Sequence, residues 1–465
     1  MKLTIYHTND IHSHFEEFSR IAACLRRQRK PQDLLLDAGD LHDFLRPEMS
    51  GTNGRIGKYL LEYLEYDAVA AGNNEGFTEP DALASIAKTG KVPVLSANIA
   101  QLDGSPVPML KKSILLSRGP ERILIIGMSP GGDSYNDFYH LSGLEAEEAG
   151  TALRRELESR AGQYDVCVLL SHLGIEEDRR LARLFPQLQV IIGGHSHTVM
   201  ETPERVGGAV IHQAGGYGTY LGKLTLEIED HKVTDFSGEL IESAAFEPDP
   251  GFLQLYQEQK AEAEKNLRRP LFTLVETLWF DPVMENPLTN FIADQLYRTY
   301  SCDFACINSG IVSFGLTGTI SKMKLLQASP SHLNPTHGVI RGQQLYEAVC
   351  QTLMPEHCLA PGRGPGFRGM LVGRLHVSEN VKIVVRDGQP EIFVDGQPLV
   401  MERDYRVVMT DYLQRGSGYP SLATEREVVF EAGFIRDLLL RTLPGLSVDS
   451  PCFRKRYEEG NRSAS

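Results

Sequence analysis

The first half of this 465-residue chain alternates short apolar runs with amphipathic segments, and this alternation limits the folds that it can adopt. The apolar runs are rich in Val, Ile and Leu and are short enough to be buried strands. Between them, apolar side chains recur at helical spacing, as Ile56, Tyr59 and Leu60 do. Strands that alternate with helices predict an α/β domain, which we expect to end near Ile241. The predicted strands are residues 3–8, 34–37, 68–70, 92–95, 123–128, 166–171, 190–192 and 210–213.

The composition changes after this domain. Residues 246–269 begin with two prolines, Pro248 and Pro250, and then carry many acidic and basic side chains, which predicts a solvated helix that links two domains. From Pro270 onward a predicted helix is mixed with glycine-punctuated strands, and Asp387-Gly388 predicts a hairpin. The helix is expected at residues 288–300 and the strands at 370–377, 381–385, 391–394 and 405–409. We therefore expect a domain at residues 1–241, a linker helix at 242–269 and a second domain at 270–465.

The net charge limits the partners of the chain. The formal charge is −14, whereas bulk electrostatic binding to nucleic acid or to an anionic membrane surface needs basic faces, so we expect neither partner. A local cation can still make a cleft favourable to a small anion. The longest apolar stretches, such as residues 123–128, are too short to cross a bilayer.

The cysteines and the N-terminus bear on the cellular compartment. The seven cysteines form no C-x-x-C pair, and their odd number argues against a disulfide framework. The N-terminus has no apolar signal region before His7. We therefore expect a protein of the reducing cytoplasm, and the sequence leaves its oligomeric state open.

Side chains that bind metals follow several predicted strands at the point where each strand ends. Because the carboxyl ends of strands in an open α/β sheet gather at one edge, we expect these groups to meet in one place. Any one of them alone is weak support for a metal site, but their recurrence after five strands predicts a site for two ions. The residues are Asp10, His12, Asp40, Asn73, His172, His195 and His197.

The chemistry of these groups limits the metal. They are imidazole, carboxylate and amide groups with no thiolate, which suits two divalent ions of Zn, Mn, Fe, Co or Ni rather than calcium or copper(I). Two divalent ions bridged by one carboxylate can hold a phosphate and lower the pKa of water. The pattern therefore predicts a small phosphorylated substrate.

The strand-end segments occur in a characteristic order. They are Thr8-Asn9-Asp10-Ile11-His12, Gly39-Asp40, Gly72-Asn73, Ser96-Ala97-Asn98, Ser171-His172 and Gly194-His195-Ser196-His197. In this order they closely resemble the calcineurin-like metallophosphoesterases, and within them the two-domain 5'-nucleotidase branch with its cytoplasmic bacterial members. The resemblance is specific in residues 1–240 and weaker after residue 270.

This resemblance implies a fold and a set of roles. The first domain would be a four-layer αββα sandwich, in which two sheets pack together between helices. The second would be an α+β domain that closes over the metals and supplies the substrate pocket. The implied ligands are Asp10, His12 and His197 for one ion, Asn73, His172 and His195 for the other, and Asp40 as the bridge between them.

The chain departs from the family in its third block. That block usually reads G-N-H-E-F-D, and its His stabilises the phosphoryl transition state or protonates the leaving oxygen. Here Asn74 occupies the His position and Phe77 the Asp position. Asparagine cannot titrate near pH 7, and losing a positioned general acid typically costs about 10²–10⁴-fold in rate. We expect Asn74 and Asp40 to act in catalysis. The loss of the general acid should slow the hydrolysis of aryl phosphates least, because their leaving group needs no proton. His14 and His42 are candidate substitutes, although a surface or supporting position is the simpler interpretation of each.

The second domain departs as well. The family's nucleotide pocket often carries N-x-G-G-I-R, but here Val312 stands at or near the Arg position. Its G-G-D-G-Y block has Ser417 in place of the Asp. Tyr412 could stack on a base or could be a core tyrosine, and Arg415 could replace the missing Arg. The implied substrate-binding residues are Asn308, Gly310, Tyr412, Arg415 and Tyr419.

Three functions remain open from the sequence. The leading one is a two-metal phosphomonoesterase of the 5'-nucleotidase kind, acting on nucleotides or related small phosphates in nucleotide breakdown. The second is a phosphodiesterase or pyrophosphohydrolase on cyclic or dinucleotide substrates, since the fold and the metals do not decide which ester bond breaks. The third is a weakly active, metal-dependent binding or regulatory protein, which the altered third block favours.

Overall fold

The structure is a computed structural model that describes residues 1–44, 46–77, 81–364, 367 and 369–460. It divides into two units, Met1–Glu264 and Lys265–Ser465. The division falls inside the segment that the sequence analysis assigns to a linker helix. Each unit has its own apolar core, and each is described separately below.

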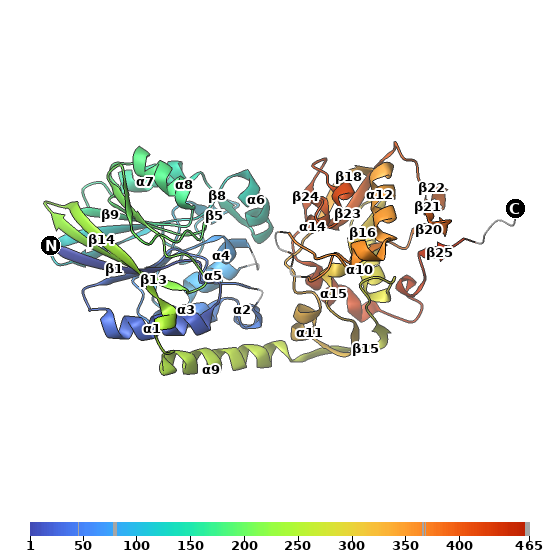
Figure 1. Cartoon of the computed structure of the whole chain (residues 1–465), viewed down its shortest axis with the longest axis horizontal. Coiled ribbons are helices and arrows are strands. Elements are labelled where there is room, and N and C mark those ends of the chain that lie inside the picture. The colour runs from blue at the N-terminus through green and yellow to red at the C-terminus, as the bar shows by residue number, and fades with distance from the viewer. Residues whose placement is uncertain (45, 78–80, 365–366, 368, 461–465) are drawn as a thin grey trace. The chain divides into compact units, whose positions relative to one another are not determined.

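Unit 1 is built around two sheets that pack face to face (Figure 1). The first sheet has the strand order β14-β13-β1-β2-β3-β4, and the second has the order β11-β12-β10-β9-β7-β6. The strands are β1 (Lys2–Thr8), β2 (Leu34–Asp37), β3 (Ala68–Ala70), β4 (Val94–Leu95), β6 (Ser113–Arg118), β7 (Glu121–Met128), β9 (Val166–Ser171), β10 (Val190–Gly193), β11 (Glu204–Val206), β12 (Ala209–His212), β13 (Tyr220–Glu229) and β14 (Lys232–Glu242). A separate ribbon pairs β5 (Ile99–Gln101) with β8 (Leu144–Ala146).

Helices cover the outer face of each sheet. Figure 1 places α1 and α3 on one side of the unit and α7 and α8 on the other. Strand β9 shows why: Val168 faces the other sheet while its neighbour Leu169 packs under the α7 and α8 side, so both faces are buried and the strand is apolar throughout. The order helices, sheet, sheet, helices confirms the predicted four-layer αββα sandwich. The helices are α1 (Phe15–Gln28), α2 (Pro47–Thr52), α3 (Arg55–Tyr63), α4 (Asn73–Phe77), α5 (Ala82–Lys88), α6 (Asp133–Tyr139), α7 (Ala149–Ser159) and α8 (Ile175–Leu184).

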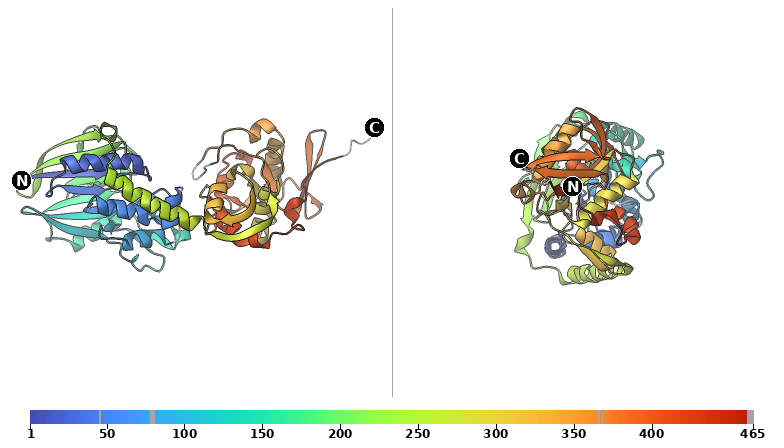
Figure 2. Two further views of the ribbon diagram at one scale, coloured as in Figure 1. Left: turned by 90° about the horizontal axis from the view of Figure 1, so that it is seen from below. Right: turned by 90° about the vertical axis from the view of Figure 1, so that its right-hand side faces the viewer.

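Helix α9 (Pro250–Leu267) lies in the segment predicted to be a solvated linker. Its first half is packed on unit 1, because Phe252 meets Phe18 edge-on at 5.3 Å and Tyr256 meets Phe15 at 5.3 Å between ring centres. The view from below in Figure 2 shows α9 beside the helices of this face. A pair of aromatic residues spaced by four in an otherwise charged segment is enough to dock one side of the helix.

Unit 2 is an α+β domain, as predicted. Its larger sheet has the order β19-β16-β23-β18-β24, and a smaller one has the order β22-β21-β20-β25. The strands are β15 (Pro270–Leu278), β16 (Phe304–Asn308), β17 (Leu316–Ser321), β18 (Pro335–Arg341), β19 (Leu375–Val377), β20 (Val381–Arg386), β21 (Gln389–Val394), β22 (Gln397–Pro398), β23 (Asp404–Thr410), β24 (Val429–Phe430) and β25 (Tyr457–Glu459). The helices are α10 (Pro287–Thr299), α11 (Lys322–Ala328), α12 (Gly342–Thr352), α13 (Pro355–Cys358), α14 (Asp411–Gln414) and α15 (Ile435–Thr442).

Two element predictions need comment. The Asp387-Gly388 hairpin is confirmed: both residues have positive φ, at 48° and 79°, between the paired strands β20 and β21. The strand predicted at residues 370–377 is wrong in its first part, since β19 begins only at Leu375. The carbonyls of Leu371 and Val372 instead lie so close to Gly310 that a Cβ there would meet them at 2.0 and 2.4 Å. This segment is therefore held by a backbone contact rather than by a strand ladder.

Two predictions from composition can be compared with the structure. Among the described residues, no helix combines the length and the hydropathy needed to cross a bilayer. All seven cysteines lie in the described part of the chain as free thiols. Burial raises the pKa of Cys306 to about 12, so this thiol stays protonated.

Candidate functional site

Loops that follow the carboxyl ends of five strands of unit 1 bring their metal-binding side chains together. Two overlapping sets have all their ligand atoms within 4.8 Å of one another: Asp10, Asp40 and His172 form one, and Asp10, His12 and His197 form the other. Asp10 belongs to both sets. The strand-end pattern therefore has a three-dimensional counterpart, and five of the seven predicted ligands lie in these two sets.

The distances within the sets suit shared ions. His172 Nε2 lies 3.3 Å from Asp40 Oδ2 and 3.8 Å from Asp10 Oδ1. His197 Nε2 lies 3.2 Å from Asp10 Oδ1, and His12 Nε2 lies 3.9 Å from Asp40 Oδ2. Asp40 therefore reaches a histidine of each set, as a bridging carboxylate would, and the bridging role itself stays a prediction.

Two of the predicted ligand atoms are left without a conventional hydrogen bond. Nε2 of His172 and Oδ1 of Asn73 are buried and have no hydrogen-bond partner among the described residues. Buried polar atoms nearly always find a partner, so each such atom needs an explanation. Nδ1 of His172 lies 2.7 Å from the carbonyl oxygen of Ala38, which fixes the ring with Nε2 toward the carboxylates. The residues therefore fit a bound metal.

His195 lies beside the two sets rather than inside them. Its ring meets that of His172 edge-on at 5.1 Å, and its backbone N–H donates to Asp10 Oδ2 at 2.9 Å. Its Nε2 lies 2.7 Å from the hydroxyl of Tyr135, on α6. Sequence reasoning missed Tyr135. The signal that could have found it is its position in the segment that follows β7, another strand of the second sheet.

Asn74 contacts two of the predicted ligands. Its backbone N–H donates to Asp40 Oδ1 at 2.9 Å, and its side-chain amide lies 3.0 Å from Nδ1 of His12. Because a carboxamide can present either its N–H or its oxygen, Asn74 can hold the His12 ring with Nε2 toward Asp10 and Asp40. The side chain that replaces the family's His is thus placed to orient a ligand, and its catalytic role stays a prediction.

The two candidate substitutes for the missing imidazole are placed differently. His42 is buried, with Nδ1 2.7 Å from Glu75 Oε1 and Nε2 2.9 Å from the carbonyl of Gly54, so it supports the loops from behind. His14 is partly exposed and lies 3.8 Å from Glu17. The carboxylate of Glu75 accepts the backbone N–H groups of Gly72 at 2.7 Å and Asp40 at 3.2 Å, so it holds these two loops together.

The ligand loops have an unusual backbone. A positive φ is uncommon outside glycine and costs energy, and such residues gather at functional sites. Here the positive-φ residues of these loops are Asp10 (51°), His12 (46°), Ser13 (58°), Asp40 (52°), His195 (73°) and His197 (50°). The strain is therefore concentrated where the predicted ligands meet.

Charge balance at the site is visible in its pKa shifts. Burial alone would raise the pKa of Asp40, but the imidazoles of His172 and His12 outweigh it and hold the pKa below its ordinary value. Burial alone would lower the pKa of His172, but Asp40 and Asp10 raise it to about 10. The carboxylates therefore demand a positive charge, which a divalent cation would supply in place of that proton.

The predicted substrate residues of unit 2 are mostly buried. The ring of Tyr412 stacks on Phe367 with centres 4.3 Å apart, and its exposure is 1%. Tyr419 is fully buried and donates its hydroxyl hydrogen toward Gly373 O at 2.7 Å. In this conformation both tyrosines are core residues, because each has a ring or a carbonyl of its own unit as partner. Their contact with a substrate stays a prediction.

The other three residues differ among themselves. Asn308 is buried and donates to Val372 O at 2.6 Å, while its Oδ1 has no partner among the described residues. Gly310 is required by the close approach of Leu371 described above. Arg415 is exposed, with its guanidinium 3.5 Å from Asp411. Of the five, Arg415 is therefore the one exposed residue, and it is already paired with Asp411.

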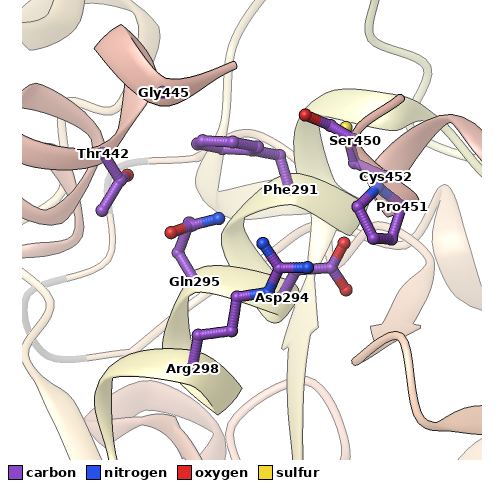
Figure 3. Close-up of a pocket in the computed structure, with 9 residues that line it drawn as sticks. All are labelled: Phe291, Asp294, Gln295, Arg298, Thr442, Gly445, Ser450, Pro451 and Cys452. Carbon is purple, nitrogen blue, oxygen red and sulfur yellow. The ribbon is translucent and has the colours of Figure 1, made fainter. Parts of the chain in front are cut away.

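Unit 2 also holds a small pocket of about 210 Å³ (Figure 3). Its charged side chains are already paired: Arg298 binds Glu379 at 2.7 and 2.8 Å, and Asp294 binds Arg456 at 2.8 Å. The lining residues are Phe291, Asp294, Gln295, Arg298, Thr442, Gly445, Ser450, Pro451 and Cys452. With its charges satisfied internally, this pocket is a structural feature rather than the candidate site.

Comparisons with known proteins assign both parts of the chain to known domain families. Residues 3–199 match the calcineurin-like phosphoesterase family, and residues 276–424 match the 5'-nucleotidase C-terminal domain. The chain is 28% identical over 473 residues to "Uncharacterized metallophosphoesterase YunD" of Bacillus subtilis, covering 94% of this chain and 98% of that protein. It is 28% identical over 288 residues to human 5'-nucleotidase, covering 49% of this chain and 47% of that protein.

The fold has solved counterparts. The structure of Haemophilus influenzae NAD nucleotidase aligns with a TM-score of 0.67 at 15% identity, covering 99% of each chain. The two matched domains are thus both present in this chain, the phosphoesterase domain first and the 5'-nucleotidase C-terminal domain second. The chain belongs to the calcineurin-like metallophosphoesterases of the 5'-nucleotidase family, which are metal-dependent hydrolases of phosphoric esters.

Proposed function

We propose that this protein is a two-metal phosphomonoesterase of the 5'-nucleotidase kind, acting on nucleotides or related small phosphates. One observation carries the proposal: His172 Nε2 and Asn73 Oδ1, predicted ligands of the same ion, are both buried without a hydrogen-bond partner among the described residues. Atoms left unpaired in this way, next to two carboxylates, fit a cation. The human relative named above is a 5'-nucleotidase.

The proposed ligands of the two ions follow the family pattern. Asp40 is proposed to bridge the two ions, and its short distances to His172 and His12, proposed ligands of different ions, support that role. When bound, the ions supply Lewis acidity toward the phosphate and lower the pKa of water. Imidazole, carboxylate and amide ligands suit Zn, Mn, Fe, Co or Ni. The proposed ligands are Asp10, His12 and His197 for one ion and Asn73, His172 and His195 for the other.

Asn74 gives the proposed reaction its particular character. Its amide can donate a hydrogen bond to a phosphoryl oxygen, but it cannot give a proton to the leaving oxygen. Nucleotides, whose leaving alkoxide needs a proton, should therefore react more slowly than aryl phosphates of the same charge. The expected handicap is about 10²–10⁴-fold relative to a site that keeps its general acid.

We also propose that unit 2 selects the substrate. Arg415 is the residue proposed to bind an anionic group of the substrate, because it is exposed and is the cation nearest to the altered G-S-G-Y block in the sequence. Asn308, Gly310, Tyr412 and Tyr419 are proposed to shape the pocket. Since Tyr412 is buried on Phe367, opening that ring pair is a condition for any contact with a base.

The proposed setting is nucleotide breakdown in the cytoplasm. Seven free thiols support a reducing compartment. The net charge of −14 supports a small substrate rather than nucleic acid or an anionic membrane as the partner.

One panel of assays tests these proposals. The purified protein, loaded in turn with Mn²⁺, Zn²⁺ and Co²⁺, is given nucleoside monophosphates, an aryl phosphate, a cyclic nucleotide and a dinucleotide. We expect monoester hydrolysis that is lost in Asp40→Asn. Activity on diesters alone would replace the proposal with the phosphodiesterase alternative, and no activity with a full metal complement would favour a binding or regulatory protein.

A variant at position 74 tests the altered third block. Asn74→His restores the family's imidazole and should raise nucleotide hydrolysis more than aryl phosphate hydrolysis, because only the former needs a proton for its leaving group. Asn74→Gln, which keeps an amide, is the matched control. An equal change on both substrates would contradict the assigned role.

A further inference from the structure

A network of polar side chains lies behind two of the ligand loops. Its centre is Asp178, a fully buried residue of α8. Oδ1 of Asp178 accepts a hydrogen bond from the hydroxyl of Ser171, and Oδ2 accepts one from the side-chain amide of Gln213 at 3.0 Å. The amide oxygen of Gln213 in turn accepts one from the hydroxyl of Ser196 at 2.9 Å. These four residues form the Asp178 network.

Each end of the network adjoins predicted metal ligands. Ser171 directly precedes His172, and Ser196 stands between His195 and His197. His172 and His195 are proposed ligands of the same ion. The network therefore joins two ligand loops, which follow different strands, through one carboxylate and one amide.

Backbone groups reinforce this connection. Oγ of Ser171 accepts the backbone N–H of Leu173 at 3.3 Å, and Oγ of Ser196 accepts that of Ile175 at 3.1 Å. Leu173 and Ile175 lie in the segment that follows His172. Both serines therefore hold this segment, in addition to their bonds within the network.

The network leaves no room for a side chain at the end of β10. A Cβ at Gly193 would lie 2.2 Å from Oδ2 of Asp178 and 2.5 Å from Nε2 of Gln213. Gly193 is the last residue of β10 and lies two positions before His195. Glycine therefore lets the backbone that leads into the His195 loop approach the carboxylate and the amide closely.

A buried carboxylate is a costly choice at this position. Burying a charge costs free energy unless it is paired, and both donors to Asp178 are neutral groups. Burial raises the pKa of Asp178 to about 7, although both hydrogen bonds oppose the rise. Perturbed acids of this kind gather at functional sites.

We propose that Asp178 is a positioning residue, which fixes His172 and His195 relative to each other for the ion that both are proposed to bind. The inference rests on the proposed function and deepens it, because it names the group that holds two ligands of one ion in place. Asp10 and His12, proposed ligands of the other ion, lie outside the network. The effect of breaking the network should therefore fall mainly on one ion.

The test compares a broken network with a rearranged one. Gln213→Met removes the amide, so Asp178 and Ser196 lose their shared partner. Ser196→Ala, at a partly exposed position, breaks the network at its end and is the milder variant. The double variant Asp178→Asn with Gln213→Glu exchanges the carboxylate and the amide. The new amide at position 178 can donate to the new carboxylate at position 213, and both serine hydroxyls keep an acceptor.

A control separates positioning from general stability. Ser113→Ala removes a buried hydroxyl of the same sheet that donates to Glu156, on α7. It should lower the free energy of unfolding in urea and leave metal binding unchanged, because neither residue belongs to the Asp178 network.

Metal binding is the readout. Metal-free protein, shown to be folded by circular dichroism, is titrated with Mn²⁺ by calorimetry. We expect two binding steps in the wild type, and Gln213→Met should weaken one of them by about 10–100-fold, the typical effect of replacing a partner that orients metal ligands. Ser196→Ala should weaken the same step by less, and the double variant should bind both ions as the wild type does.

Three results would overturn the inference. Gln213→Met and Ser196→Ala that lose stability but bind both ions as tightly as the wild type would show that the network only braces the fold. A double variant that binds as weakly as Gln213→Met, or equal weakening of both steps, would contradict the positioning role. A wild type that binds two ions, responds to Gln213→Met as expected and hydrolyses no ester would instead contradict the proposed function and leave this inference standing.

Discussion

Asp40 and Glu75 hold each other's loops. Oε2 of Glu75 accepts the backbone N–H of Asp40 at 3.2 Å, and Oδ1 of Asp40 accepts the backbone N–H of Asn74, next to Glu75, at 2.9 Å. Asp40, the predicted bridging residue, is thus held by one hydrogen bond at its backbone N–H and by another at its side chain. Because Asp40 has a positive φ of 52°, these bonds also stabilise a strained conformation.

Replacing Glu75 tests this arrangement. Glu75→Gln replaces one carboxylate oxygen with an amide NH₂, which donates hydrogen bonds and cannot accept them. In one orientation this NH₂ faces the backbone N–H groups of Gly72 and Asp40, and in the other it faces the N–H groups of His42. Leaving a buried donor unpaired costs about 1–3 kcal/mol, so we expect a lower free energy of unfolding and weaker metal binding. Urea denaturation and metal titration measure the two effects. Glu379→Gln, at a largely surface ion pair, should cost less than about 1 kcal/mol. Similar costs for the two variants would contradict the role of Glu75.

Tyr135 should affect the metal that His195 is proposed to bind. A ligating imidazole usually donates its other ring N–H to a fixed acceptor, and Tyr135 Oη, 2.7 Å from Nε2, is placed to be that acceptor. We expect Tyr135→Phe to weaken metal affinity by about 10–100-fold, measured by competition with a chelating dye. Tyr164→Phe, at a partly buried tyrosine packed against the apolar cluster of the second sheet and α7, is the control. Unchanged affinity in Tyr135→Phe would exclude the assignment.

The buried pair of His7 and His212 should make unit 1 sensitive to acid. His7 Nε2 lies 2.9 Å from His212 Nδ1, and His212 Nε2 lies 3.0 Å from the carbonyl of Met200. Nδ1 of His7 is buried without a partner among the described residues, so a proton there would be an unpaired donor. Burial accordingly lowers the pKa of His7, and it lowers that of His212 from 6.5 to about 4.

The sign of the effect follows from these shifts. Between about pH 4 and 6.5 the unfolded chain binds protons that the folded chain does not, so stability is lost as the pH falls through this window. Each fully titrating imidazole contributes up to about 1.4 kcal/mol per pH unit. Urea denaturation from pH 7 to pH 5 should show a shallower decline in His212→Asn than in the wild type. Parallel declines would rule out this pair as the cause.

A buried ion pair between Arg456 and Asp294 should contribute to the stability of unit 2. Arg456 donates to both oxygens of Asp294 at 2.8 Å, and the two side chains are 3% and 2% exposed. Arg456→Leu leaves a buried carboxylate alone, which typically costs about 3–5 kcal/mol. The double variant Asp294→Leu and Arg456→Leu removes both charges and should regain much of this loss. Trp279, the single tryptophan, reports the unfolding of unit 2 by fluorescence. A double variant less stable than Arg456→Leu would contradict this account.

The sequence predicts the metal-binding residues of the site better than it predicts the residues that support them. The metal-binding residues could be predicted because they follow strands in the sequence, and parallel strands bring their carboxyl ends to one edge of the sheet. The partners behind them are contacts between distant segments: Tyr135 meets His195 across 60 positions of sequence, and no local pattern encodes such a pair. The burial of Tyr412 likewise depends on Phe367, 45 positions away by their residue numbers.

The fold shows the same division. Strands β2, β3 and β9 were predicted with their observed ends, since both faces of each are buried and the apolar run coincides with the strand. The β13–β14 hairpin was missed. Strand β14 has mostly exposed or half-buried side chains and lies at the edge of its sheet, so its sequence carries no apolar pattern. Pairing with β13, rather than burial, makes it a strand.

The most direct test of the account is the number of divalent ions bound per chain. Metal-free protein is titrated with Mn²⁺ by calorimetry, and the bound ions are counted by elemental analysis after gel filtration. We predict two ions per chain in the wild type and a loss of at least one in Asp40→Asn, because that carboxylate is proposed to serve both. A folded wild-type chain that binds no ion, or an Asp40→Asn variant that binds two as tightly, would contradict the two-metal site.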